Sequence, residues 1–164
     1  MRIITVVLTA CSLVLSACND NKEATNQSGS VASDYLNSKQ FRQLLWRVAE
    51  GWNNGDARAA ADCFTKDAVY IEPPDQQLYQ GRDELFEFFG GTEGRADPMN
   101  MTWHHLIFDE EQQIGTGEYT FVYKGRLSHG IVIVHLSKGK IRRWREYQYR
   151  STTKWADFIG QSAF

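Results

Sequence analysis

Residues 52–73, WNNGDARAAADCFTKDAVYIEP, decide the fold. Gly55 suits the left-handed conformation that ends a helix, and Asp56 can cap the start of the next helix. The side chains expected to face inward from this short second helix are Ala60, Ala61 and Phe64. Apolar alternation from Ala68 to Glu72 then predicts a strand, which two prolines end. The segment therefore predicts a helix end, a short helix and an opening strand.

The flanking sequence completes an α+β pattern. Before this segment, apolar residues recur at helical spacing: Phe41, Leu44, Leu45, Val48 and Trp52. After it, residues 80–91 (QGRDELFEFFGG) predict a third helix, with acidic residues in its first turn and two glycines at its end. Strands are expected at about Met101–Phe108, Ile114–Lys124, His129–Leu136 and Lys140–Tyr149. Three helices on a mostly antiparallel sheet are the predicted fold class.

The N-terminus predicts export and lipid attachment. Arg2 precedes an apolar run from Ile3 to Leu15, which is typical of a secretory signal. The ending Leu-Ser-Ala-Cys resembles a bacterial lipobox, which implies cleavage before Cys18 and lipidation of its sulfur. We therefore expect a signal peptide over 1–17, a polar tether over 18–33 and a folded domain over 34–164. The predicted location is the cell envelope, facing the periplasm. An aspartate directly after the lipidated cysteine would favour retention in the inner membrane of Gram-negative bacteria. Here Asn19 follows Cys18 and the aspartate comes one place later, at Asp20, so the outer membrane is favoured.

Composition limits the function classes. The formal net charge of −2 and the lack of a long basic stripe give no electrostatic case for nucleic-acid binding. Cys63 would be the one unmodified cysteine of the mature chain, so no internal disulfide is expected. We expect Cys63 to be a small buried hydrophobic residue. The four histidines lack the clustering of metal ligands. We predict neither a metal site nor a cofactor.

The order of elements resembles the nuclear-transport-factor-2-like superfamily. The resemblance rests on residues 52–73 and on GRDELFEFF and GKIRRWREYQ, and it covers roughly Phe41 to Tyr149. Within the superfamily, the SnoaL-like (polyketide-cyclase-like) and ketosteroid-isomerase-like branch is the most similar. The resemblance implies a cone-shaped, strongly curved sheet wrapped by three N-terminal helices. Its function stays open, because this scaffold hosts isomerases, dehydratases, cyclases, hydrolases and binding modules.

Glu72 occupies the position that holds the catalytic base in ketosteroid isomerases, according to the resemblance. The donors that such enzymes offer to the enolate oxygen would fall near Val48 and Val132, so they are missing. Steroid isomerisation is therefore not the predicted activity. Glu72 is either a carboxylate facing a pocket or a charge that ends a strand in water.

The last strand predicts a second carboxylate in the cone. Alternation puts Trp144, Glu146 and Gln148 on one face, which the resemblance assigns to the cavity. A buried Glu146 would need a partner to share its proton, and the candidates are Glu72, His104 and His105. Otherwise, Glu146 is exposed and pairs with an arginine. The two histidines alternate, so only one is expected to face inward; either one could instead be structural.

The opposite face of the sheet predicts a dimer contact. The resemblance places this face on the outside of the sheet. It mixes charged, aromatic and aliphatic side chains, which suits an interface between subunits. Its expected members are His129, Ile131, Ile133, His135, Arg143, Arg145, Tyr147 and Tyr149.

Aromatic residues on one face of the 114–124 strand complete the candidate cavity. Tyr119 and Phe121, together with Trp144 and Gln148, predict walls for a small, mainly apolar ligand; alternatively, the aromatic residues only fill the core. The leading hypothesis is a ligand-binding envelope lipoprotein. The alternatives are a cofactor-independent lyase, isomerase or cyclase that uses Glu72, Glu146 and one of His104 and His105, and a dimeric protein-interaction domain.

Overall fold

The computed structural model describes residues 34–72 and 77–162. The predicted signal peptide, the tether with Cys18, and the two prolines after Glu72 lie outside the described residues. Within the described ranges, none of the helices combines the length and the apolar character that crossing a bilayer requires.

Two helices begin the fold as predicted. α1 (Ser38–Asn53) starts with a capping box between Asn37 and Gln40 and buries the predicted apolar face. The backbone N–H of Ala59 donates to the Asp56 carboxylate over 2.8 Å and so caps α2 (Ala57–Ala61). The inward positions of α2 are confirmed, although Phe64 belongs to the following strand.

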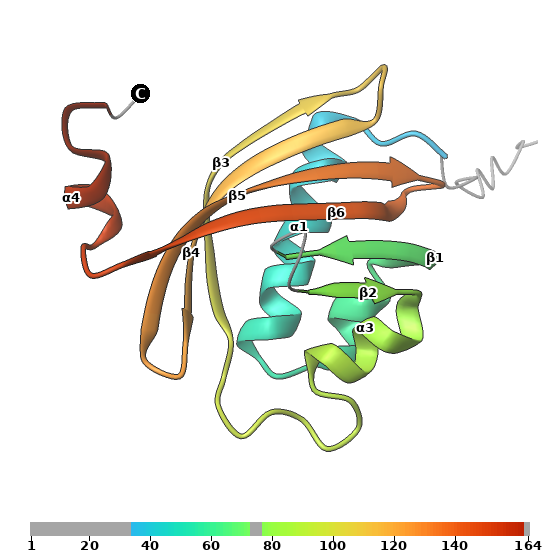
Figure 1. Cartoon of the computed structure of the whole chain (residues 1–164). Coiled ribbons are helices and arrows are strands. Elements are labelled where there is room, and N and C mark those ends of the chain that lie inside the picture. Colours follow the sequence, from blue (N-terminus) through green and yellow to red (C-terminus); the bar gives the residue numbers. More distant parts are fainter. Residues whose placement is uncertain (1–33, 73–76, 163–164) are drawn as a thin grey trace, which may run out of the picture.

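Six strands form a curved sheet (Figure 1). They are β1 (Phe64–Ile71), β2 (Leu78–Gln80), β3 (Asn100–Asp109), β4 (Ile114–Tyr123), β5 (Arg126–Ser137) and β6 (Lys140–Ser151). The other elements are α3 (Arg82–Phe89), between β2 and β3, and, after β6, α4 (Trp155–Ile159) and a 3₁₀ turn (Gly160–Ser162). The strand order is β2-β1-β6-β5-β4-β3, and only β1 and β6 run parallel. The α+β fold class is confirmed. Two details were wrong: β1 begins at Phe64 rather than Ala68, and β2 was not predicted.

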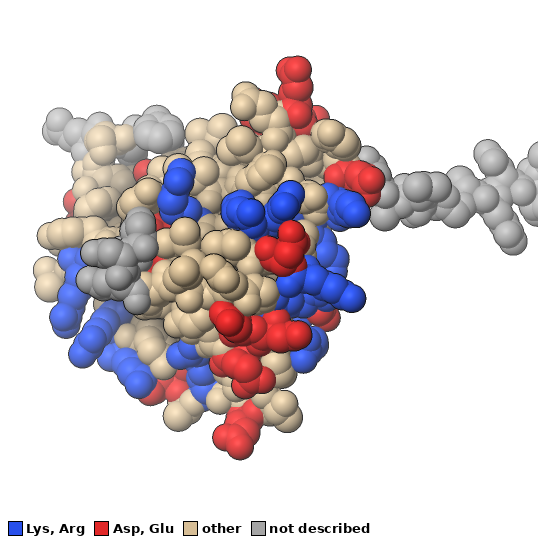
Figure 2. Space-filling view, turned by 45° about the vertical axis from the view of Figure 1, so that its right-hand side comes forward, with Lys and Arg blue, Asp and Glu red and all other residues tan. Residues whose placement is uncertain are grey.

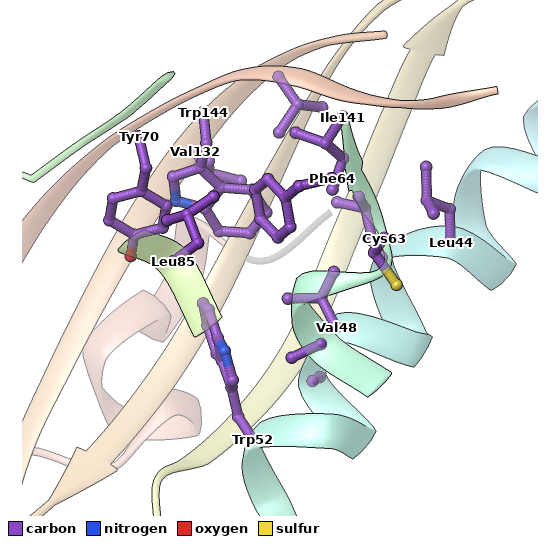
Figure 3. Close-up of a cluster of buried hydrophobic side chains, with 14 of the residues drawn as sticks. Leu44, Val48, Trp52, Cys63, Phe64, Tyr70, Leu85, Val132, Ile141 and Trp144 are labelled. Carbon is purple, nitrogen blue, oxygen red and sulfur yellow. The ribbon is translucent and has the colours of Figure 1, made fainter. Parts of the chain in front are cut away.

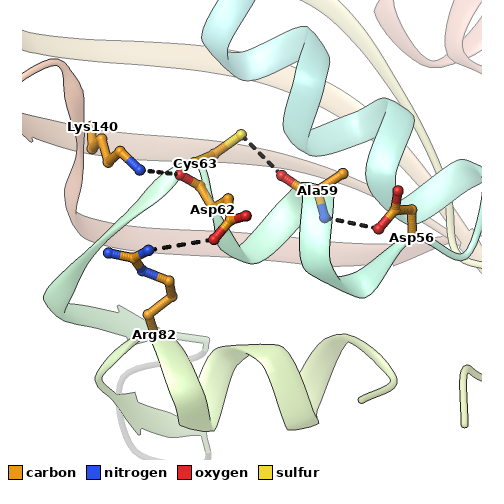
Figure 4. Close-up of polar contacts among 6 residues, drawn as sticks. All are labelled: Asp56, Ala59, Asp62, Cys63, Arg82 and Lys140. Carbon is orange, nitrogen blue, oxygen red and sulfur yellow. Dashed lines mark hydrogen bonds and ion pairs between the residues drawn. The ribbon is translucent and has the colours of Figure 1, made fainter. Parts of the chain in front are cut away.

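Polar contacts join α2, β1, α3 and β6 at one end of the sheet (Figure 4). Arg82 forms an ion pair with Asp62 at 3.3 Å, and the Lys140 ammonium donates to the Asp62 carbonyl over 2.8 Å. Cys63 is buried, as predicted, and its thiol donates to the Ala59 carbonyl over 3.4 Å. Burial raises the pKa of this thiol, so it packs as a neutral group.

The core lies between the helices and the inner face of the sheet (Figure 3). Trp144, on β6, is 1% exposed and is the largest fully buried side chain. Its ring stacks on Tyr70 at 5.6 Å and meets Trp52 and Phe64 at 5.8 and 5.9 Å. One aromatic cluster therefore joins β6, β1 and α1.

The outer face of the sheet is partly covered by α4. Trp155 stacks on His104 with ring centroids 3.8 Å apart, and Phe158 packs on His129 at 4.6 Å. Beyond α4, the face exposes Ile131, Ile133, Tyr147 and Tyr149. Figure 2 shows Lys, Arg, Asp and Glu side chains distributed over one face of the molecule, with acidic and basic side chains next to each other in several places.

Candidate functional site

A cavity of about 290 Å³ opens on the inner face of the sheet. Its aromatic and apolar lining consists of Trp52, Tyr70, Phe88, Met99, Phe121 and Tyr123. Its polar lining consists of Glu72, Gln77, Arg95, Arg126, Ser128, Glu146 and Gln148. The cavity is therefore more polar than the sequence predicted.

Two carboxyl groups meet in the wall of this cavity. Glu146 and Glu72 are only 4% and 7% exposed, and a hydrogen bond links their side chains. The Tyr70 hydroxyl donates to Glu146 Oε1 over 3.0 Å, and the Trp144 indole N–H donates to Oε2 over 2.7 Å. Both oxygens of Glu146 are thus held by donors that are themselves buried.

The electrostatics favour one shared proton. Burial, and then the negative charge and hydrogen bond of Glu72, raise the pKa of Glu146 well above its ordinary value. Burial and the neighbouring carboxylates also raise the pKa of Tyr70, which therefore stays protonated and acts as a donor. Because two adjacent carboxylates in a dry wall repel each other, the pair retains a proton that separate glutamates would lose.

Strand alternation and register explain how the pair forms. Tyr70 precedes Glu72 by two residues, and Trp144 precedes Glu146 by two, so each pair of residues points to one face. Tyr70 is opposite Trp144 in the parallel pairing of β1 with β6. The inward row of β1 therefore lies beside the inward row of β6, and both carboxylates reach the same wall. Among the alternatives that the sequence left open, Glu146 is therefore buried, and its neighbour is Glu72 rather than a histidine or an arginine.

The predicted ligand-binding residues divide into two groups. Phe121 and Gln148 line the cavity. Tyr119 and Trp144 are 1% exposed and lie behind the lining residues, so they support the wall without forming it. The Tyr119 hydroxyl is buried, and burial, with the nearby charge of Glu146, raises its pKa.

The prediction that one histidine of the pair faces the cavity is wrong. Trp103 pairs with Tyr119 and Leu106 with Gly117, so His104 and His105 share one partner position in a β-bulge. The bulge turns both side chains to the outer face. There His105 Nδ1 lies 2.7 Å from Glu118 Oε2, and His104 Nε2 lies 2.7 Å from Thr120 Oγ1.

Several residues that line the cavity were not predicted from the sequence. Tyr70 had a signal, since it alternates with Glu72 on a predicted strand. Arg95 lies in the loop before β3, where no periodicity indicates its direction. Val48 and Val132, where the resemblance placed the missing donors, are fully buried apolar side chains. The tyrosine that donates a hydrogen bond comes from β1 instead.

No metal-binding group is evident in the part of the chain that the structure describes. Within residues 34–72 and 77–162, no three His, Cys, Asp or Glu side chains are grouped as metal ligands.

The pKa of Glu146 makes stability depend on pH. Because the folded protein holds this proton more tightly than the unfolded chain, unfolding releases it, and stability falls as pH rises above about 4.5. The free energy of unfolding should fall by about 1.4 kcal/mol per pH unit just above that value. Glu146→Gln removes the titrating group, so its unfolding free energy should lack this slope. Urea unfolding between about pH 5 and pH 7 measures it.

Glu111→Gln is the control, because this exposed carboxylate lies in the turn between β3 and β4, away from the cavity. It should keep the slope of the unchanged protein. If Glu146→Gln also kept that slope, the raised pKa would be contradicted.

Comparison with known proteins gives the family. The family model described as SnoaL-like domain matches residues 46–144, which is more than half of the chain. The chain belongs to the SnoaL-like family. This SnoaL-like protein has no significant sequence match among curated proteins.

Solved structures share its fold at low sequence identity. A candidate ketosteroid isomerase from Kribbella flavida has a TM-score of 0.58 and 16% identity, covering 71% of this chain and 82% of its own. An epoxide hydrolase of the LEH-like kind from M. tuberculosis has a TM-score of 0.57 and 16% identity, covering 68% and 84%. An NTF-2-like protein of unknown function from Burkholderia xenovorans has a TM-score of 0.59 and 19% identity, covering 77% of this chain and 94% of its own. At these identities, the likeness shows the fold alone.

Proposed function

We propose that the cone binds a small organic molecule and that the Glu72–Glu146 pair transfers a proton to or from it. The domain would then be a cofactor-independent enzyme of the lyase, isomerase or cyclase kind. One observation carries this proposal: two adjacent buried carboxyl groups lie in the wall of an aromatic-lined cavity. Such a pair separates a group that gives a proton from one that takes it.

The roles follow from the contacts. Burial and the neighbouring Glu72 raise the pKa of Glu146, so Glu146 is the partner proposed to keep the proton. Tyr70 and Trp144 hold its two oxygens in place. Glu72 directly follows β1, lines the cavity and is the partner proposed to take a proton from the bound molecule. His104 and His105 have no part in this proposal, because both lie on the outer face.

The fold relatives are consistent with this reading. The proteins from Kribbella flavida and M. tuberculosis are described as an isomerase and an epoxide hydrolase, respectively. The cavity of this chain combines aromatic rings with several polar groups, which suits a small organic molecule.

Native mass spectrometry of the gently purified full chain tests whether the cone holds a small molecule. We expect a bound organic molecule to be released on unfolding. Ser128→Phe is the matched variant, because Ser128 lines the cavity and a phenyl ring there fills it. An empty protein that also fails to catalyse proton abstraction from carbon would refute the proposed function.

We also propose that Cys18 anchors the domain to the envelope membrane, with the outer membrane favoured. The supporting observation is the lipobox-like ending of the export signal. Intact-mass measurement of the mature protein should show a diacylglyceryl-modified Cys18 at the N-terminus, and Cys18→Ser should abolish the modification. An unmodified cysteine would contradict the anchor.

A homodimer through the outer sheet face is the remaining proposal. Ile131, Ile133, Tyr147 and Tyr149 are exposed there beside Arg145, an apolar and aromatic mixture that suits an interface. Sedimentation velocity should show a dimer that Arg145→Glu separates; a monomeric unchanged protein would exclude it.

A further inference from the structure

Arg95 is a cation held in the wall of the cavity. Its Nη1 donates to the Tyr123 hydroxyl over 3.0 Å, and its Nη2 donates to the Phe88 carbonyl. Its guanidinium also lies 5.2 Å from the Phe88 ring centre and 5.3 Å from that of Tyr123. These contacts fix the group at the cavity and leave further N–H donors unused.

Neither cavity arginine has an acidic partner among the described residues. The ion pairs found in residues 34–72 and 77–162 involve Arg82, His105 and Arg142, but neither Arg95 nor Arg126. Arg95 is only partly exposed, and its Nε is buried with no acceptor. A partly buried guanidinium usually has a carboxylate or phosphate partner, since its charge is costly to bury alone.

The sheet register separates Arg126 from the carboxyl pair. Glu146 lies opposite Val132 on β5, and Gln148 lies opposite Gly130. Ser128 and then Arg126 follow on the same face of β5, and Arg126 pairs with Tyr123. Six residues separate Val132 from Arg126, about 20 Å along a strand. One wall therefore runs from the carboxyl pair through Gln148 and Ser128 to Arg126.

The charges along this wall do not balance. With Glu146 protonated, the described lining carries two positive charges, on Arg95 and Arg126, against one negative charge on Glu72. A monoanionic ligand would neutralise the excess. The aromatic side chains between the two ends suit an apolar body.

We propose that the natural ligand is an amphipathic organic anion, with an aromatic or alicyclic body and one carboxylate. The carboxylate binds Arg95, with Arg126 nearby, and the body lies toward the Glu72–Glu146 pair. This inference rests on the proposed function and names its substrate class. A guanidinium fits a carboxylate through two parallel hydrogen bonds.

A pair of probes that differ only in charge tests the proposal. Indole-3-acetate and indole-3-acetamide have nearly the same shape, and only the first is an anion at neutral pH. Calorimetric titration of the full chain in detergent, with empty micelles as the blank, measures both. We expect the acid to bind about 10- to 100-fold more tightly than the amide. Arg95→Gln should remove that preference and leave amide binding nearly unchanged.

Control variants keep the test decisive. Arg145→Gln removes an arginine from the outer face and should preserve the preference for the acid. Arg95→Lys keeps the charge without the planar fork and should retain part of it. If Arg95→Gln fails to fold, Arg126→Gln replaces it, because this side chain is exposed and should reduce the preference by a smaller factor.

The outcomes separate the two proposals. Equal binding of acid and amide would overturn the anionic ligand and leave the proposed function standing. Binding of neither probe would also overturn it. The proposed function has its own test with a neutral substrate, whose reaction does not depend on recognition of a carboxylate.

Discussion

Trp144→Ala is expected to destabilise the domain by about 3–5 kcal/mol. The side chain is 1% exposed and contacts four aromatic rings, those of Trp52, Phe64, Tyr70 and Trp103. Removing it leaves a cavity among these rings, which belong to different elements and cannot all move inward. It also removes the donor to Glu146 Oε2, so a buried carboxyl oxygen loses its partner.

Trp46→Ala is the matched control for this prediction. Trp46 lies on α1 and is 45% exposed, so its loss should change the free energy of unfolding by about 0.5 kcal/mol or less. Urea unfolding followed by far-UV circular dichroism measures both variants without relying on tryptophan fluorescence. Similar small losses for both would show that the aromatic cluster does not hold the sheet to the helices.

Glu72→Gln is expected to lower the rate of proton abstraction by about 100- to 10,000-fold. A suitable neutral substrate is 5-nitrobenzisoxazole. A base removes its C3 proton while the N–O bond breaks, giving a cyano-nitrophenolate whose absorbance is followed directly. In the cavity, Glu72 would take the proton, and the electron pair of the C–H bond would form the nitrile. Glutamine has the same shape but does not act as this base.

The fold should survive this substitution, because a glutamine carbonyl still accepts the proton that Glu146 holds. Glu118→Gln is the control carboxylate and should keep the full rate. Equal rates for Glu72→Gln and the unchanged protein would assign the reaction to another group and remove the proposed role of Glu72.

The sequence predicted the fold well because its signals were local. Helical spacing, the Gly55–Asp56 cap and strand alternation all act within a few residues. The parallel pairing of β1 with β6, which brings Glu72 beside Glu146, was not predicted, because it joins segments about 75 residues apart in the chain. β2 was missed because three residues are too short for a periodic pattern.

The site was predicted only in part, for two physical reasons. Alternation fails at a β-bulge, so one added residue between Trp103 and Leu106 turned both His104 and His105 outward. Loop residues carry no periodicity, so the direction of Arg95 could not be inferred. The carboxyl pair was accessible because Glu146 lies on β6 and Glu72 directly follows β1, and both continue an alternation with large aromatic residues.

The most direct test of the account is an NMR titration of the glutamate side-chain carboxyl carbons in the ¹³C-labelled full chain. Glu72→Gln and Glu146→Gln identify the two resonances. We expect the Glu146 carboxyl to remain protonated well above the pH at which exposed glutamates ionise, and to shift to a lower pKa in Glu72→Gln, which removes the neighbouring negative charge. A Glu146 carboxyl that ionises together with the exposed glutamates would contradict the shared proton, and with it the proposed chemistry of the cavity.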